Sequence, residues 1–488
     1  SIVNATGTGS ITYQWESSTD NVNFNTIGGA TSVVYDSPSL TQDTWFRRLA
    51  TSTLNGNSCS ALSDTIAVSV NDIDPGTITA DQTICSGDDP VAIGSGTDAS
   101  GSGAITYQWQ QSSDNTIFTN LSGETAASYD PPALTQTRYY KRVATSTLNG
   151  KACQAESGVV TITVNDVDAG FISGNQTICN GDDPAEITST LNGTGSGTVT
   201  YQWQSSTDNI TFIDIGSATA VTYDPPVQTQ TMYFKRITNS ELNGQDCFEE
   251  SNVITVTVND IDPGDIGTDQ YICNGDVPAT LTSTTDASGS GTITYQWQSS
   301  ADNASFNNIP GAVFSEYSPA AQTQTMYYHR IATSTQNSQA CADTSSVVTV
   351  TVNDVDGGVI EQDQTICNGG NPTEITSNTD GTGSGAITYQ WQSSTDNVTF
   401  TDIGSATAVS HDPPAGLTVT TYYKRIATST LSGKECTDES NTITVTINNI
   451  SGGSIGNDQT ICNGDDPVAF SSIVNATGTG SITYQWES

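Results

Sequence analysis

Basic residues are scarce in this sequence, which has 12 Lys and Arg against 52 Asp and Glu and a formal net charge of -40 over 488 residues. A chain so acidic is repelled by nucleic acid and by anionic membranes. No stretch approaches the roughly 18 apolar residues that a membrane-spanning helix needs. The first residues lack a basic segment followed by an apolar core, so we expect no signal peptide in this segment. We therefore expect no nucleic-acid partner and no membrane insertion.

Catalytic signatures are missing as well. The sequence has no phosphate-binding loop, no dinucleotide fingerprint and no nucleophile elbow. Its two histidines, His329 and His411, stand where corresponding positions of the chain have Lys, Arg or Tyr. A catalytic triad or metal site needs residues that persist together. We predict that the chain is not an enzyme.

What the sequence does contain is a tandem repeat. The motif Tyr-Gln-Trp recurs in steps of 94 residues with a last step of 95, and two cysteine series keep the same steps. Its tryptophans are Trp15, Trp109, Trp203, Trp297, Trp391 and Trp486. Residues 1–17 and 472–488 are identical, so the sequence closes on itself after 471 residues, or five repeats. We expect it to be a window on a longer array in which this block recurs.

Short strands joined by turns fill each copy. "TVTYQWQSS" alternates, with Val199, Tyr201 and Trp203 on one face, and the "TDN" that follows marks a hairpin turn. No amphipathic helix of useful length is present. This pattern predicts an all-β chain, a tandem array of immunoglobulin-like β-sandwich domains in an extended rod, with Trp203 as a core residue of the third strand. A small barrel is the alternative fold for each copy.

The repeat period also sets the predicted domain boundaries. The first piece lacks its initial strands, and the last piece contains only initial strands. The predicted domains are 1–73, 74–167, 168–261, 262–355, 356–450 and 451–488.

Ten cysteines in an acidic, Thr-rich chain indicate an oxidising compartment. Two disulfide patterns respect the repeat. The first bridges each repeat internally and leaves Cys59 and Cys462 unpaired; its pairs are Cys85–Cys153, Cys179–Cys247, Cys273–Cys341 and Cys367–Cys436. The second crosses each junction, as in Cys59–Cys85 and Cys153–Cys179. We favour the internal pattern, since loop entropy predicts roughly 4 kcal/mol for each bridge. Metal binding by these thiols is not expected, because no Cys-x-x-Cys and no nearby His are present.

Paired aspartates mark four of the five junctions, in segments such as "VNDIDPG". In an extended segment the two carboxylates point the same way, so each pair is a candidate calcium site completed by backbone carbonyls. The alternative is a solvated acidic linker. The pairs are Asp72 with Asp74, Asp166 with Asp168, Asp260 with Asp262, and Asp354 with Asp356, whereas the fifth junction has Asn449 and Ser451.

One arginine recurs in every copy of a chain that has few bases. For this position we predict a salt bridge within the repeat, for example between Arg236 and a nearby carboxylate. A ligand-binding role is the second interpretation. The residues are Arg48, Arg142, Arg236, Arg330 and Arg425.

The strings "QTICNGDDP", "GSGTITYQWQSS", "YDPP" and "ITVTV" resemble the Ig-like repeats of giant surface adhesins in gliding Bacteroidota. The resemblance covers essentially the whole chain. It implies export through a type IX pathway, display on the cell surface, and adhesion to surface polysaccharide or an abiotic surface while the cell glides.

Together these observations predict an extracellular stalk or filament segment in which each repeat mainly contacts its neighbours in the same long chain. Two other functions stay open. One is a carbohydrate-binding array that uses exposed aromatics such as Tyr295 or Phe306. The other is a strand-exchanged extracellular polymer, in which the missing strands come from the next subunit.

Overall fold

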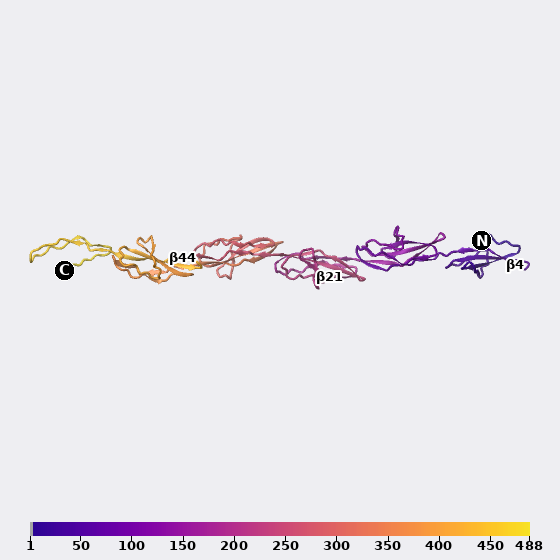
Figure 1. Ribbon diagram of the computed structural model, residues 1–488, viewed down its shortest axis with the longest axis horizontal. Coiled ribbons are helices and arrows are strands. Elements are labelled where there is room, and N and C mark those ends of the chain that lie inside the picture. Colours follow the sequence, from indigo (N-terminus) through magenta and orange to yellow (C-terminus); the bar gives the residue numbers. More distant parts are fainter. Residues whose placement is uncertain (1–2) are drawn as a thin grey trace. The chain divides into compact units, whose positions relative to one another are not determined.

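The computed structural model describes residues 3–488, and every regular element in that range is a β-strand (Figure 1). Internal contacts divide the chain into two compact units. The first comprises residues 3–176 together with Asp183–Val227 and Thr231–Val256. The second comprises Thr177–Asp182, Gln228–Gln230 and Thr257–Ser488. The prediction of an all-β chain is confirmed.

The repeat that contains Trp109 lies in the first unit and is a two-layered sandwich. Its main sheet has the order β12-β11-β13-β15-β8, and β14 pairs with the far half of β13. The opposite layer consists of β7 paired with β9 and of a bridge between Ile93 and Tyr129. The strands are β6 (Ile73–Asp74), β7 (Thr77–Ile78), β8 (Gln82–Cys85), β9 (Ser95–Thr97), β10 (Ser100–Gly101), β11 (Ala104–Ser112), β12 (Thr119–Asn120), β13 (Arg138–Leu148), β14 (Lys151–Glu156) and β15 (Val160–Asn165).

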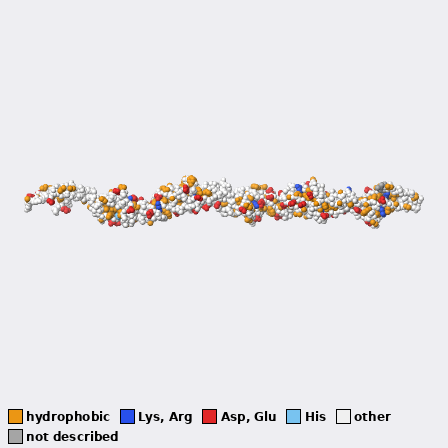
Figure 2. Space-filling view, turned by 45° about the horizontal axis from the view of Figure 1, so that its top comes forward, with side chains coloured by type: hydrophobic (Ala, Val, Ile, Leu, Met, Phe, Trp, Pro, Cys, Tyr) orange, Lys and Arg blue, Asp and Glu red, His pale blue; other side chains and the backbone are white. Residues whose placement is uncertain are grey.

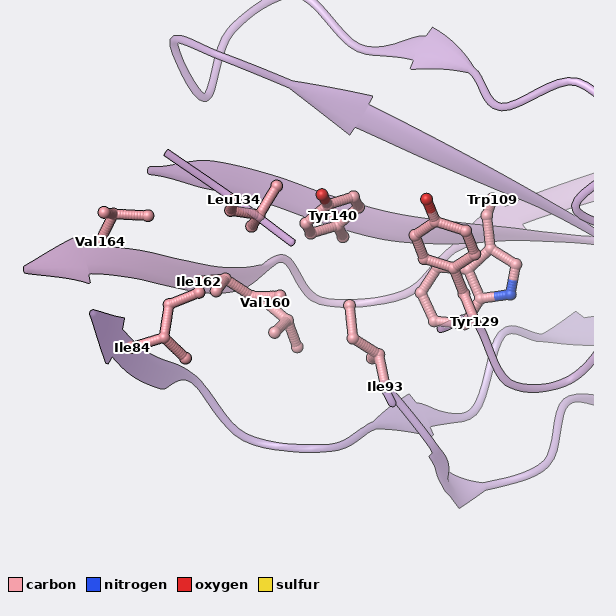
Figure 3. Packing of buried hydrophobic residues seen from close by; sticks show 9 residues of the cluster. All are labelled: Ile84, Ile93, Trp109, Tyr129, Leu134, Tyr140, Val160, Ile162 and Val164. Atoms are coloured by element: carbon pink, nitrogen blue, oxygen red, sulfur yellow. The ribbon is translucent and has the colours of Figure 1, made fainter. Parts of the chain in front are cut away.

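A hydrophobic core fills the space between the two layers of this repeat (Figure 3). Trp109 is fully buried, and its ring lies 5.8 Å from that of Tyr129, which in turn lies 5.5 Å from the ring of Tyr140. The indole N–H of Trp109 donates to the carbonyl oxygen of Ala126 at 3.0 Å, so the polar edge of the ring is satisfied inside the core. The prediction that the Tyr-Gln-Trp tryptophan is a core residue is confirmed here, and equally for Trp203, which is also fully buried.

The same strands recur in the other parts of the chain. The first unit also contains β1 (Ser10–Ser18), β2 (Asn25–Thr26), β3 (Thr44–Leu54), β4 (Asn57–Leu62) and β5 (Ile66–Val68). The copy with Trp203 has β16 (Val167–Asp168), β17 (Phe171–Ser173), β18 (Gln176–Cys179), β19 (Thr188–Leu191), β20 (Thr194–Gly195), β21 (Thr198–Ser206), β22 (Ile213–Asp214), β23 (Met232–Leu242), β24 (Gln245–Glu250) and β25 (Ile254–Asn259).

Two complete copies in the second unit repeat the sheet order, as β28-β35-β33-β31-β32 and β38-β45-β43-β41-β42. The copy with Trp297 has β26 (Ile261–Asp262), β27 (Asp265–Ile266), β28 (Gln270–Cys273), β29 (Ser283–Thr285), β30 (Ser288–Gly289), β31 (Thr292–Ser300), β32 (Asn307–Asn308), β33 (Met326–Gln336), β34 (Gln339–Thr344) and β35 (Val348–Asn353). The copy with Trp391 has β36 (Val355–Asp356), β37 (Val359–Glu361), β38 (Gln364–Cys367), β39 (Thr376–Thr379), β40 (Thr382–Gly383), β41 (Ala386–Ser394), β42 (Thr401–Asp402), β43 (Thr421–Leu431), β44 (Lys434–Glu439) and β45 (Ile443–Asn448). The chain closes with β46 (Ile450–Ser451), β47 (Ser454–Ile455), β48 (Ser472–Val474) and β49 (Thr477–Gly478).

A carboxylate fixes the turn after each Tyr-Gln-Trp strand. Oδ1 of Asp208 accepts the backbone N–H groups of Ile210 and Thr211, both at 2.8 Å, and the hydroxyl of Ser206 donates to it at 2.8 Å. Asn209 adopts a φ of 59°, a left-handed conformation that asparagine tolerates. Because these hydrogen bonds favour the ionised carboxylate, they lower the pKa of Asp208 to about 2.

Candidate functional site at the repeat junctions

At three junctions, a buried asparagine joins one repeat to the hairpin of the repeat that follows it. Asn165 ends β15 and is fully buried. Its side-chain N–H groups donate to the carbonyl oxygens of Ser240 at 2.7 Å and Gln245 at 3.0 Å, and its Oδ1 accepts the hydroxyl of Ser240 at 2.6 Å. Ser240 and Gln245 lie on the hairpin formed by β23 and β24. The hydrogen-bonding capacity of this amide is thus directed at the neighbouring repeat.

Sequence reasoning missed this residue. The same contacts are made by Asn71 to Ser146 and Lys151, by Asn259 to Ser334 and Gln339, and by Asn353 to Ser429 and Lys434. A signal was present, because the "VND" motif places an asparagine at the end of an alternating apolar strand in four copies, where burial without partners is costly.

Disulfides bind the same hairpins to the preceding repeats. They join Cys85 to Cys247, Cys179 to Cys341 and Cys273 to Cys436, with Cα–Cα distances of 5.5, 5.4 and 5.5 Å. In each pair the first cysteine ends a short edge strand such as β8, and the second lies on the returning hairpin strand of the next repeat, such as β24. Beside the first bridge, the side-chain amide of Asn243 donates to the hydroxyl of Thr83 at 3.1 Å.

This pairing overturns both predicted patterns, and the strand register explains why. Cys85 lies level with Asn165, three residues beyond Ile162, which pairs with Arg138. Cys153 pairs with Ser146, eight residues from Arg138 in the opposite direction. The two cysteines of one repeat are therefore separated by roughly 36 Å along the sheet, whereas a disulfide needs Cα atoms within about 7 Å.

The predicted bridges Cys85–Cys153, Cys179–Cys247, Cys273–Cys341 and Cys367–Cys436 do not form, and neither do the cross-junction bridges of 26 residues. Among residues 3–488, the cysteines with free thiols are Cys59, Cys153, Cys367 and Cys462.

The junction aspartates act on the backbone of the turn that begins each repeat. Oδ1 of Asp168 accepts the N–H of Gly170 at 2.7 Å, and Asp74, Asp262 and Asp356 make the same bond to Gly76, Gly264 and Gly358. Gly170 has a φ of 70°, and a Cβ there would collide with the carbonyl oxygen of Leu191.

The first aspartate of each pair has a different role. Asp260 and Asp354 accept the side-chain amides of Asn180 and Asn274, each at 2.8 Å, and Asp72 accepts the N–H of Ile73. Asp166 donates its own N–H to the hydroxyl of Ser196 at 3.1 Å. Within residues 3–488, no cluster of three or more His, Cys, Asp or Glu is arranged to hold a metal ion. Calcium binding by the aspartate pairs stays a prediction.

Within residues 3–488, the recurring arginine makes no salt bridge at Arg142, Arg236, Arg330 or Arg425, contrary to the prediction. Arg236 is fully buried, and its guanidinium donates to the carbonyl oxygens of Val221 at 2.8 Å and Ala169 at 3.0 Å and to the hydroxyl of Ser189 at 3.0 Å. It also lies 4.5 Å above the ring of Tyr201. Burial lowers the pKa of Arg236 from its usual value. The charge is solvated by carbonyl dipoles and an aromatic face, which suits the planar guanidinium.

This arginine also fixes the start of its own repeat. Ala169 follows the junction aspartate Asp168, so the bond from Arg236 ties the linker to the centre of β23. Arg142, Arg330 and Arg425 make the equivalent bonds to Pro75, Pro263 and Gly357. The linker at the start of each of these repeats is therefore held in place by a side chain from the core of that repeat.

The two histidines serve packing. His411 stands where the copy with Trp109 has the core residue Tyr129. Its ring lies 5.4 Å from that of Trp391 and 5.6 Å from that of Tyr423. His329 stacks on Phe306 at 4.0 Å and shares a hydrogen bond of 2.6 Å with Gln298. Burial lowers the pKa of both histidines.

The aromatic residues considered for carbohydrate binding are also engaged within their repeat. Phe306 is covered by His329, and the ring of Tyr295 lies 4.6 Å from the guanidinium of Arg330. Both side chains are only partly exposed.

Acidic side chains are spread over the surface, and lysines and arginines are few on the face that Figure 2 shows. Within residues 3–488, no helix is long and apolar enough to cross a membrane. Disulfides and immunoglobulin-like domains are both typical of extracellular proteins.

One protein family, described as a domain of unknown function (DUF8696), matches the chain five times, at residues 1–72, 74–166, 168–260, 262–354 and 356–449. The chain belongs to the DUF8696 family. Each of its repeats is thus one DUF8696 domain, and this family carries no enzymatic description. No curated protein matches the chain.

Solved structures similar to the DUF8696 array consist of tandem immunoglobulin-like domains. Three N-terminal domains of the Hoc outer capsid protein of bacteriophage RB49 align with 57% of this chain and 98% of their own, at 13% identity and a TM-score of 0.28. Sidekick-1 immunoglobulin domains 1–5 align with 90% of this chain and 92% of their own, at 12% identity and a TM-score of 0.21. Titin domains I67–I69 align with 56% of this chain and 95% of their own, at 12% identity and a TM-score of 0.32.

Proposed function

We propose that this chain is a segment of the stalk of a repetitive extracellular adhesin, displayed on a cell surface and acting as a spacer. The observation that carries the proposal is the recurrence of one junction, in which an asparagine, buried in three of four cases, binds the hairpin of the next repeat. Repeats bound to their neighbours in this way resist bending at the joints more than repeats connected by a free linker would. Such a chain is suited to act as a spacer that keeps the structures at its two ends apart.

The resemblance of the repeat to the gliding-motility adhesin SprB of Bacteroidota supports a finer proposal. On that reading the stalk is exported through a type IX pathway and moved by the gliding motor. Its partners are the neighbouring repeats and a surface polysaccharide or an abiotic surface.

Small-angle X-ray scattering on chains of two, three and four complete repeats tests the spacer role. The proposal predicts that the maximum dimension rises by a constant step of roughly 35 Å per repeat, the length of an eleven-residue strand such as β13. Oxidised samples with blocked free thiols would be used, so that no chain is linked to another. A maximum dimension that levels off as repeats are added would contradict the proposal.

A carbohydrate-binding array is the second candidate function. Because Tyr295 contacts the guanidinium of Arg330 and Phe306 is stacked on His329 of the same repeat, we favour the spacer. Incubating the oxidised chain with a glycan array distinguishes the two, since the spacer proposal predicts no specific binding. Saturable binding that is lost in Tyr295→Ala would instead support the carbohydrate function.

A further inference from the structure

The three disulfides overlap one another along the sequence. Their partners are 162, 162 and 163 residues apart, whereas the cysteines of one series recur every 94 residues. Each bridge therefore begins before the previous one ends. As a result, every peptide bond between Cys85 and Cys436 lies inside at least one disulfide-closed loop.

Internal pairing would not have this consequence. A bridge from Cys85 to Cys153 and another from Cys179 to Cys247 would leave the segment between Cys153 and Cys179 outside every loop. In the structure, that segment lies inside the loop closed by Cys85 and Cys247. The segment between Cys247 and Cys273 lies inside the loop closed by Cys179 and Cys341. Each linker between Cys85 and Cys436 is thus backed by a second covalent connection.

We propose that these overlapping bridges turn the repeat array into a covalent ladder, which transmits tension without unfolding of its repeats and stays in one piece after any single backbone cleavage between Cys85 and Cys436. This property goes beyond the spacer role and is independent of what the array adheres to.

Tension has a short covalent route through the ladder. From Cys85 it crosses to Cys247, follows the backbone through β25 and β28 to Cys273, and crosses to Cys436. This route holds about 26 residues, or at most ~90 Å of extended backbone, against about 350 residues and ~1,200 Å for the backbone alone. The core tryptophans Trp109, Trp203, Trp297 and Trp391 all lie off the route, so pulling on the oxidised chain does not draw them out.

Burial protects the bridges from reduction. Cys247, Cys341 and Cys436 are 1%, 3% and 3% exposed, and a reducing thiolate must reach a sulfur atom to attack it. On the hairpin side, each bridge is therefore shielded while the two repeats stay docked.

A site-specific cut in the segment between Cys153 and Cys179 tests the ladder. A protease recognition sequence is inserted between Gly158 and Val159, which are both exposed and lie between β14 and β15. Free thiols are first alkylated, and the structure predicts that four react, whereas internal pairing predicts two and cross-junction pairing none. After cleavage, we expect one species of full mass on a denaturing gel without reductant and two fragments with it. Fragments that separate without reductant would overturn the proposal.

Two matched variants complete this experiment. The same insertion between Asp64 and Thr65, the corresponding exposed loop of the first piece, lies outside the ladder, and we expect its fragments to separate without reductant. Combining the Gly158 insertion with Cys85→Ser and Cys247→Ser should also release the fragments. If that combination stays joined, a bridge such as Cys153–Cys179 holds the chain, and the observed pairing is wrong.

Single-molecule stretching tests the transmission of tension. Unfolding one unbridged repeat would release about 94 residues, or ~300 Å of contour length. We expect no step of this size from the oxidised region between Cys85 and Cys436, and we expect such steps after reduction. Repeat-sized steps in the oxidised chain would refute the short route, even if the array proved to be an extended spacer.

Discussion

Replacing Asn353 by alanine should loosen the hairpin of the repeat that follows it. Asn353 is fully buried, its amide donates to the carbonyl oxygens of Ser429 at 2.8 Å and Lys434 at 3.0 Å, and its Oδ1 accepts the hydroxyl of Ser429 at 2.7 Å. At about 1 kcal/mol net for each hydrogen bond, the three amount to roughly 3 kcal/mol. The groups left without a partner stay buried, so relaxation of the site should recover little of this loss.

Hydrogen exchange of the backbone amides of β44 measures this loosening. The chain is reduced first, because the bridge from Cys273 to Cys436 otherwise holds the same hairpin. Since about 1.4 kcal/mol corresponds to tenfold in an equilibrium constant, we expect exchange to accelerate roughly 100-fold in Asn353→Ala.

The chain supplies a matched control in Asn448, which ends β45 at the corresponding position, in "INN" instead of "VND", but is exposed and accepts a hydrogen bond from Thr479. Asn448→Ala should change exchange in the preceding hairpin by less than about fivefold. Equal effects of the two substitutions, or an unchanged rate in Asn353→Ala, would show that the buried amide does not hold the junction together.

Three further predictions concern single repeats and their joints. Arg425→Met leaves the carbonyl oxygens of Gly357 and Val409 unpaired in the core, so the free energy of unfolding of this repeat should fall by about 3 kcal/mol or more. Urea denaturation beside a wild-type chain measures this change. A loss below about 1 kcal/mol would show that the hydrogen bonds from Arg425 to these carbonyl oxygens contribute little. Hydrogen bonds from the backbone N–H of Thr399 and from Ser394 lower the pKa of Asp396 from 3.8 to about 2. Its carboxylate therefore stabilises the fold above pH ~4, and this contribution is lost as the pH falls toward 2. Asp396→Asn should be less stable than the wild type at pH 7 and equally stable near pH 2, and a stability difference independent of pH would show that the ionised carboxylate does not stabilise the turn. If the junction aspartates bind calcium, millimolar Ca²⁺ should raise the melting temperature and a chelator should reverse the change, and an unchanged melting temperature removes that hypothesis.

Much of the single repeat could be predicted from the sequence because its signals are local. The alternation around Trp203 and the "TDN" turn each depend on a few neighbouring residues, and both are present as predicted. The arginine also had a local signal, since Phe234, Arg236 and Thr238 alternate along β23 and all three are buried. Its partners were predicted wrongly because carbonyl oxygens supplied by the linker do not show in a residue pattern.

The junction was harder to predict because it depends on strand register. The alternating strand β23 continues past its pairing with β25 and turns back at Asn243 and Gly244 into β24. That extension carries Cys247 away from the cysteine of its own repeat. The spacing of 68 residues between Cys179 and Cys247, the two cysteines of one repeat, suggests that a disulfide could close a loop within the repeat. The two thiols lie at opposite ends of the sheet, however, and each therefore pairs with a cysteine of a neighbouring repeat.

The borders of the main sheet limit how crowded chains interact. In the copy with Trp391, one border is β42, with two residues, the other is β38, with four, and β44 is tied through Cys436 to the repeat before it. A neighbouring molecule adds a strand most readily to a long, open edge. Chains packed side by side at high density should therefore slide past one another and stay soluble, rather than merge into cross-β fibrils.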